Sequence, residues 1–375
     1  MTPTIELCKQ LIERPSVTPD DAGCFPLILE RLKDFDIQVT RLDCEDVENI
    51  LITIGDEGPL LIFLGHTDVV PTGPESQWRY PPFEPTEEGD LLYGRGTADM
   101  KGSIAAFITA TERFLIAKPS LKARFGILLT SDEEGAADYG IRYVAPELQR
   151  RGIDIDYCLV GEPSSTNKLG DIIKNGRRGS LGATLRVIGK QGHVAYPQLA
   201  DNPIHRAMQA LSDLVATEWD QGNDFFPPTS FQISNINSGT GATNVIPGDL
   251  EVICNFRYST ETTANELKTR FEAVLNAAHL TYEITWKLNG EPFLTAEGEL
   301  VEACIKGVER VTGSTPTLST SGGTSDGRFI APLGAQVVEL GPLNATIHQV
   351  DEHVSMSDLN QLSEVYEDII RQLTT

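Results

Sequence analysis

The sequence predicts an α/β protein, a mixed sheet covered by helices and interrupted by a smaller ferredoxin-like α+β domain. Near-continuous apolar runs alternate with helical patterns between residues 48 and 162, which is typical of a sheet covered on both faces. Around 179–291 the pattern changes to the order βαββαβ, which can close as a domain by itself. The length of 375 residues also exceeds the usual limit of one hydrophobic core.

The first part of the larger domain is predicted to span 1–178 and to begin with a helix. Apolar residues recur there at three- to four-residue spacing, Thr2 can cap the helix, and Pro15 ends it. Apolar runs then predict strands, and a helical pattern separates two of them. The strands lie at 50–55, 60–65, 124–131 and 156–162, and the helix at 103–117.

The insertion is predicted to span 179–291, and the larger domain to resume over 292–375. In the insertion we expect strands at 180–189, 229–237, 249–259 and 281–289, with helices at 202–219 and 263–278. After Pro292 we expect a helix at 297–311, a Ser/Thr/Gly-rich loop, a strand at 335–341 and a closing helix at 357–373.

The composition excludes several classes of protein. A formal charge of −24 argues against nucleic acid or an anionic membrane as the main partner, because both attract basic surfaces. The amino terminus has no basic leader, and no run of 18 apolar residues predicts a membrane span. Six scattered cysteines without a C-x-x-C pair indicate reduced thiols, so we expect a cytoplasmic protein.

Acids and histidines follow the predicted strands of the larger domain. Each of them alone is more often a cap or a structural residue than a ligand. Nearly all of them gather at the carboxyl ends of one predicted sheet, where ligands bind in α/β proteins, and so many acids at one place need cations to neutralise them. The residues are His66, Asp68, Asp99, Glu133, Glu134, Glu162 and His348.

Histidines together with carboxylates favour Zn²⁺ or a related divalent ion over Ca²⁺ or Mg²⁺. A carboxylate that bridges two ions is the arrangement of two-metal hydrolases. Asp68, two residues from His66, is well placed to orient its imidazole. A hydrolytic site also needs a base that is not a ligand. The stretch DEEG at 132–135 meets that need, because one glutamate can bind metal while its neighbour handles the proton.

Alternatives remain at this level. His353 follows the same predicted strand as His348 and could replace it as a ligand. GTSDG at 323–327 matches G-x-S-x-G, which would make Ser325 a nucleophile, although a poor strand precedes it. A structural metal site is disfavoured, because such sites are usually rich in cysteine and no cysteine joins this group.

Four segments, LGHTDVVPTG, YGRGTADMKG, TSDEEG and GEPS, resemble signature segments of the zinc amidohydrolases that include aminoacylases and acetylornithine deacetylases. The resemblance covers nearly the whole chain and implies two Zn²⁺ ions per subunit, with Co²⁺ able to substitute. It also implies a cis peptide after the bridging aspartate. By this resemblance the roles are His66 and Glu162 on one zinc, Glu134 and His348 on the other, Asp99 as the bridge, Glu133 as general base and Asp68 as the orienting partner.

Further segments, among them NGRRGSL, GHVAYP, GATNVIPG and STSGGTSDGRF, resemble the branch that hydrolyses N-succinyl-LL-2,6-diaminopimelate to succinate and LL-2,6-diaminopimelate. That resemblance implies a homodimer formed through the insertion, with His193 of each subunit acting on the oxyanion in the other. It also implies substrate contacts from Arg177, Asn244, Arg257, Gly323, Thr324 and Asn344.

Acetylornithine deacetylases and general aminoacylases remain competitors, because they share every metal residue. A relative that has lost activity but holds metal is a further alternative. The loop GAADYGIRYV after Glu134 departs from the commonest version, which leaves only the conformation of that loop open.

Overall fold

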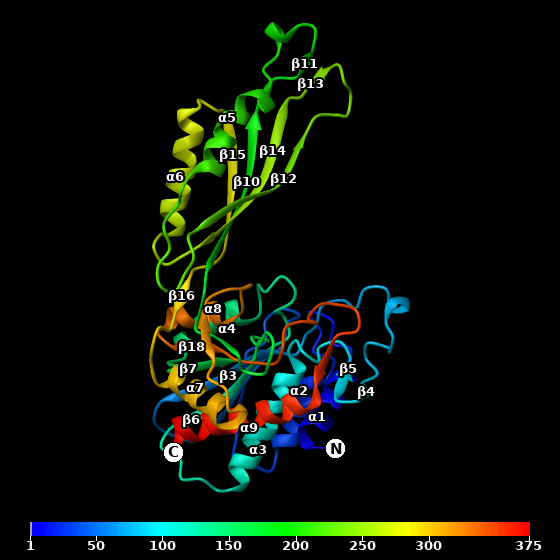
Figure 1. Ribbon diagram of the computed structural model, residues 1–375, viewed down its shortest axis with the longest axis vertical. Coiled ribbons are helices and arrows are strands. Elements are labelled where there is room, and N and C mark those ends of the chain that lie inside the picture. Colours follow the sequence, from blue (N-terminus) through cyan, green and yellow to red (C-terminus); the bar gives the residue numbers. More distant parts are fainter. Residues whose placement is uncertain (1) are drawn as a thin grey trace. The chain divides into compact units, whose positions relative to one another are not determined.

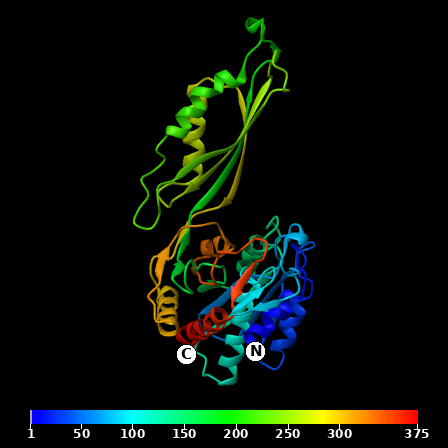
Figure 2. The same cartoon turned by 45° about the vertical axis from the view of Figure 1, so that its right-hand side comes forward.

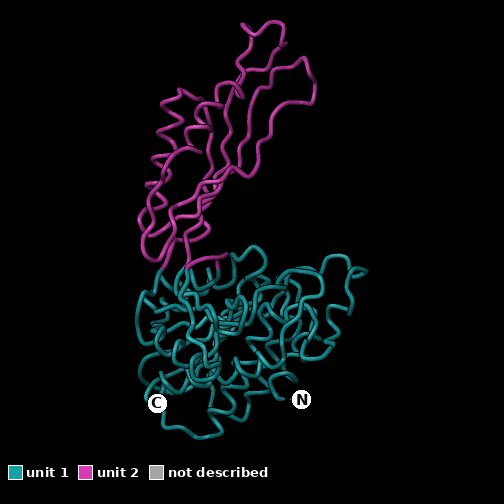
Figure 3. Tube along the Cα trace, viewed as in Figure 1, with its two compact units in different colours: residues 1–176, 294–319, 325–375 teal, residues 177–293, 320–324 magenta. Residues whose placement is uncertain are grey.

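The computed structural model describes residues 2–375, which divide into two compact units (Figure 3). The first unit comprises the chain up to Gly176, Leu294–Ser319 and Ser325–Thr375. The second comprises Arg177–Phe293 together with Thr320–Thr324. The insertion expected at 179–291 lies within the main segment of the second unit, whereas no sequence pattern indicates that 320–324 also belongs there.

The first unit is built on an eight-stranded mixed sheet. Its four central strands β6, β3, β7 and β18 run parallel to one another, while β1, β2 and β8 pair antiparallel with a neighbour. The mixed sheet confirms the predicted fold class. In spatial order the strands are β1 (Gln38–Arg41), β2 (Asn49–Ile54), β6 (Arg124–Thr130), β3 (Leu60–His66), β7 (Tyr157–Val160), β18 (Gln336–Glu339), β8 (Ile172–Lys174) and β17 (Thr317–Ser319).

Helices cover the sheet of the first unit (Figure 1). One layer shares a single hydrophobic core with alternate residues of the strands, and it consists of α1 (Pro3–Ile12), α2 (Cys24–Leu32), α3 (Lys101–Ile116), α7 (Glu299–Thr312) and α9 (Met356–Thr374). Outside that core lie α4 (Ile141–Arg150) and the short α8 (Gly327–Ile330), which contacts β7 and β18. Both faces of the strands are buried in consequence, as the continuous apolar runs predict.

The ends of the helices follow from local chemistry. The Thr2 hydroxyl accepts a hydrogen bond from the Ile5 amide and Pro3 occupies the first turn of α1, as predicted. Ser355 caps α9 in the same way. Ser355 is also the last residue of β19 (His353–Ser355), which forms a small three-stranded sheet with β5 (Leu91–Tyr93) and β4 (Thr86–Glu88).

The second unit has the ferredoxin-like order. Its strands are arranged β12-β14-β10-β15, all antiparallel, and the two helices α5 and α6 lie on one face (Figure 2). This confirms the predicted α+β character. In chain order the elements are β10 (Gly179–Ile188), α5 (Pro203–Ala216), β12 (Ser230–Ser238), β14 (Asp249–Tyr258), α6 (Ala264–Ala277) and β15 (Tyr282–Gly290).

Shorter elements complete the chain. β11 (Gly192–His193) pairs with β13 (Val245–Ile246) in the second unit. β9 (Gly176–Arg177) and β16 (Phe293–Leu294) span the boundaries between the units, and single 3-10 turns occur at Glu75–Gln77, Pro197–Leu199 and Ala331–Leu333. None of the helices formed by residues 2–375 combines the length and the apolar character that crossing a membrane requires.

Candidate metal centre

Three neighbouring parallel strands bring the predicted residues to one edge of the large sheet. His66 is the last residue of β3 and pairs in register with Thr130, the last residue of β6. Glu134 follows β6 by four residues, and Glu162 follows β7 by two. Because the carboxyl ends of parallel strands meet at one edge, side chains from distant parts of the sequence converge there.

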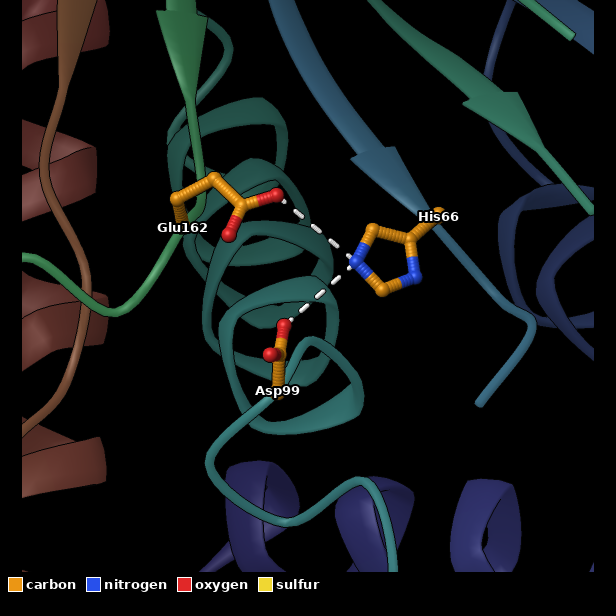
Figure 4. A group of neighbouring side chains, drawn as sticks. All are labelled: His66, Asp99 and Glu162. Atoms are coloured by element: carbon orange, nitrogen blue, oxygen red, sulfur yellow. Dashed lines mark ion pairs between the residues drawn. The ribbon is translucent and has the colours of Figure 1, made fainter. Parts of the chain in front are cut away.

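A first group of potential ligands is formed by His66, Asp99 and Glu162 (Figure 4). The His66 Nε2 atom lies 3.4 Å from Asp99 Oδ1 and 3.7 Å from Glu162 Oε1. The His66 side chain is only 2% exposed. Both His66 Nε2 and Asp99 Oδ1 are buried without a hydrogen-bond partner among the described residues, which is costly unless another group satisfies them.

A second group consists of Asp99, Glu134 and His348. The His348 Nε2 atom lies 3.2 Å from Asp99 Oδ2 and 2.9 Å from Glu134 Oε1. Asp99 therefore turns one carboxylate oxygen towards each histidine. Within each group all ligand atoms lie within 4.8 Å of one another, and a set of imidazole nitrogens and carboxylate oxygens suits Zn²⁺ and related transition metals. The Asp99–Met100 peptide is cis, as the family resemblance implies.

Asp68 is buried and ties the two glutamates to the first histidine. Its carboxylate accepts the backbone N–H of Glu133, at 3.2 and 3.3 Å, and that of Glu134 at 3.0 Å. The His66 Nδ1 atom lies 2.9 Å from the Asp68 backbone oxygen and 3.6 Å from its nearer carboxylate oxygen. The backbone carbonyl is thus the closer partner of the imidazole, because the carboxylate faces the amides of the DEEG turn.

The electrostatics of the centre favour proton uptake. Hydrogen bonds to Asp99 and Glu134 raise the pKa of His348 to about 10. Burial alone would lower the pKa of His66, but the nearby carboxylate of Asp99 and the negative charges of Asp68 and Glu133 outweigh it and hold that pKa well above its usual value. Burial raises the pKa of Glu162 well above its ordinary range, with further contributions from the charges of Asp99 and Glu133. Such a cluster has a strong affinity for positive charge.

Glu133 lies beside the ligands but belongs to neither ligand group. Burial, followed by the negative charge of Asp326, raises its pKa to about 8. A carboxylate with a pKa close to neutrality is well suited to accept and return a proton. Glu133 therefore has the properties of a general base.

Asp326 was not found by sequence reasoning. Its side chain is buried, neither carboxylate oxygen has a hydrogen-bond partner among residues 2–375, and burial raises its pKa to about 7. The available signal was an acid in the Gly-rich stretch GGTSDGR at 322–328. The G-x-S-x-G pattern in the same stretch indicates Ser325, as a candidate nucleophile, rather than Asp326.

The two rival residues have other partners. Ser325 is fully buried and donates to Glu339, and the helix that follows it, α8, has only four residues. A nucleophile elbow requires an exposed serine between a strand and a helix, so this geometry does not favour a serine nucleophile. His353 lies in β19, contacts the Asp351 backbone oxygen through Nδ1 and packs against Tyr93, outside both ligand groups.

The residues expected at the substrate are divided between the units. Asn344 lies in the first unit, where its amide donates to the Ser165 carbonyl. The others lie in the second unit. Arg177 donates to the carbonyl of Ser321, in the segment that carries Gly323 and Thr324.

His193 and Asn244 are neighbours elsewhere in the second unit, because the Val194 amide donates to the Asn244 carbonyl at 3.1 Å. They lie beyond the Asp249 end of β14, whereas Arg257 lies near the other end of that strand. At about 3.3 Å per residue, the eight steps from Asp249 to Arg257 span about 26 Å. Within the second unit, His193 and Arg257 therefore cannot touch the same small molecule.

The fold and the two ligand groups define a two-domain protein with a candidate dinuclear metal centre, an arrangement used by metallohydrolases. Residues 62–372 match the model of the Peptidase family M20/M25/M40, and the chain belongs to this family. It is 60% identical over 373 residues to the succinyl-diaminopimelate desuccinylase of Alkalilimnicola ehrlichii, with all of both chains covered. It is 58% identical to the desuccinylase of Thioalkalivibrio sulfidiphilus, covering 100% of this chain and 99% of the relative.

Solved structures share the fold. The M20 family metallo-carboxypeptidase Sso-CP2 from Sulfolobus solfataricus superimposes with a TM-score of 0.79 at 17% identity, covering 99% of both chains. The Bacillus subtilis YXEP protein, described as a dinuclear metal binding peptidase from the M20 family, gives a TM-score of 0.73 at 16% identity over 98% of this chain and 96% of its own. At these identities the likeness establishes the architecture alone.

Proposed function

We propose that this chain is a metal-dependent amidohydrolase that converts N-succinyl-LL-2,6-diaminopimelate to succinate and LL-2,6-diaminopimelate. The observation that carries the proposal is a pair of ligand groups sharing Asp99, next to an acid, Glu133, that belongs to neither group. The substrate follows from relatives that are 57–60% identical over essentially their full length and carry that activity in their names.

We propose two Zn²⁺ ions as the cofactor, with Co²⁺ able to substitute. His66 and Glu162 would hold one ion, Glu134 and His348 the other, and Asp99 both. The buried, unpartnered atoms His66 Nε2 and Asp99 Oδ1 support this fit. When bound, the ions supply Lewis-acid polarisation of the amide carbonyl and lower the pKa of water.

The chain itself supplies the proton transfers. Glu133 would take a proton from the attacking water and return it to the leaving amine. It can do so because it belongs to neither ligand group, and its carboxylate is therefore available to accept a proton. Asp68 fixes the backbone of Glu133 and Glu134 through their amides, and thereby holds the base beside the ligands. The substrate carries several carboxylates, which the guanidinium groups of Arg177 and Arg257 can grip in bidentate fashion.

We further propose that the active enzyme is a homodimer formed through the second unit. Exposed apolar side chains support this: Ile204, Met208 and Val215 on α5 and Ile236 on the edge strand β12. An edge strand that is paired on one side only, together with a helix that exposes apolar side chains, is a surface that a second copy can cover. The separation of about 26 Å along β14 also supports a role in trans for His193 of each subunit.

A mixing experiment tests the dimer. The variants His193→Ala and Glu133→Ala are each expected to be nearly inactive, and their mixture to regain activity after dissociation and reassociation. In a mixed dimer one centre would have both an intact Glu133 and an intact His193 from the partner. No recovery in a mixture that does form mixed dimers would exclude catalysis in trans, and activity of a monomeric variant would exclude the need for the dimer.

The substrate is tested by adding Zn²⁺ to metal-stripped protein and measuring amide hydrolysis. Zinc-dependent turnover of N-succinyl-LL-diaminopimelate, with little turnover of N-acetylornithine, is expected. Preference for N-acetylornithine would keep the metal centre and overturn the substrate. We also propose a cytoplasmic location, supported by six free cysteines, five of them buried.

A further inference from the structure

A buried ion pair lies behind the candidate metal centre and is not among the residues to which a function has been assigned. Glu352 is fully buried and Arg95 is 2% exposed. The Arg95 Nη1 atom donates to Glu352 Oε2 at 2.6 Å and to the Gln349 carbonyl at 3.1 Å. Removing two charges from water is costly, so a buried pair at this position calls for a reason other than simple stability.

The remaining contacts of the Glu352 carboxylate all go to one short segment. Its Oε2 accepts the amide N–H of Gly96 at 3.0 Å, and its Oε1 accepts those of Ala98 at 3.0 Å and Asp99 at 3.1 Å. Four donors from residues 95–99 therefore converge on one carboxylate, which satisfies their hydrogen bonds in the interior. The last of these donors is the backbone of the residue shared by both ligand groups.

Glu352 is also joined to the second histidine by the chain. His348 stands four residues before it, with φ +61°, and Asp351 has φ +59°. Non-glycine residues rarely adopt this left-handed conformation and need surrounding contacts to hold them there. The Glu352 carboxylate and the Arg95 contact to Gln349 provide such contacts.

We propose that Glu352, with Arg95, is a positioning residue that sets Asp99 and His348 at the distance that a cation requires between them. This inference rests on the proposed metal centre and extends it beyond the ligands. Under this inference the second ligand group depends on Glu352 more strongly than the first group does. The Asp99–Glu134–His348 group takes two members from segments held by Glu352, whereas His66 and Glu162 stand at the ends of strands.

The test is a competition titration of metal-stripped protein with Zn²⁺ and a chromogenic chelator, which needs no substrate. The unaltered chain is expected to bind two equivalents. The second equivalent is the one expected at the Asp99–Glu134–His348 group. In Glu352→Gln the amide NH₂ would face hydrogen-bond donors, so the affinity for this equivalent is expected to weaken about 10–100-fold, the usual cost of losing an outer partner of a ligand. Binding of the first equivalent should change less.

Glu112→Gln is the matched control, because it removes a partly buried pair with Arg31 between α2 and α3. It should lower the thermal midpoint and leave the binding of both equivalents unchanged. Two equivalents bound by folded Glu352→Gln with unaltered affinities would overturn the inference. If that variant does not fold, Arg95→Lys replaces it, and an unchanged second equivalent there has the same meaning. Failure of the unaltered chain to bind Zn²⁺ would instead refute the metal centre, and with it the proposed function.

Discussion

The two ligand groups contain the same kinds of atoms but are built differently. His66 ends a fully buried strand and its side chain is 2% exposed, whereas His348 sits on a loop and is 50% exposed. The first position is fixed by the register of the sheet, which also fixes the core. The second depends on a loop with left-handed residues and on the contacts of Glu352. The candidate centre thus combines one ligand group whose histidine is positioned by the sheet with a second group whose histidine is positioned by a loop.

The largest effect should come from a change that touches neither group. Replacing Glu133 by Ala removes the proposed base, and kcat should fall about 10²–10⁴-fold. Both equivalents of metal should still bind, because Glu133 belongs to neither ligand group. Steady-state kinetics with a parallel metal titration measures the two quantities. Retained turnover would refute the role of Glu133, and lost metal would make it a ligand.

Removing each histidine in turn tests the contrast directly. His348→Ala should abolish the second equivalent while leaving the first, since His66 and Glu162 are held by the sheet. Its loss of affinity should exceed the 10–100-fold expected for an outer partner. His66→Ala should weaken both, because it leaves Asp99 without its buried partner. Equal losses of metal affinity in the two variants, measured by metal titration, would contradict the proposed difference between the two ligand groups.

A smaller effect is expected from pH. With a pKa of about 10, His348 carries a proton near neutrality, and metal binding must displace it. Affinity at the second group should therefore rise with pH, by about tenfold per unit for each displaced proton, until the pH approaches 10. Calorimetry in buffers of different ionisation enthalpy measures the proton release. An affinity at this group that is independent of pH would contradict the protonated state.

The parts of the fold that follow from sequence are the ones with strong periodicity. Strands β2, β3 and β6 could be predicted because their apolar patterns are long and regular, and the ferredoxin-like order could be predicted for the same reason. Short elements such as β8 and β17, with three residues each, carry no comparable pattern. The helix predicted at 202–219 ends at Ala216, and Trp219 packs against Phe256 in the core of the second unit instead.

The residues of the candidate site could likewise be predicted only in part from the sequence. Residues that follow strands could be placed together, because strand order and direction bring their ends to one edge. Glu352 could not be found in this way, since its role depends on hydrogen bonds to amides some 250 residues away in sequence. Asp68 was expected to orient the imidazole of His66, and its backbone carbonyl lies closer to that imidazole than its carboxylate does. The roles in trans stay predictions.

The convergence of acids on Asp99 has a consequence for the lifetime of the folded chain. Buried carboxylates that repel one another oppose folding, and a cation that binds only the folded state reverses this penalty. At a hundred times its dissociation constant, such a cation adds about 2.7 kcal/mol to the free energy of unfolding. Scarcity of metal would then reduce the amount of enzyme that survives proteolysis as well as its turnover.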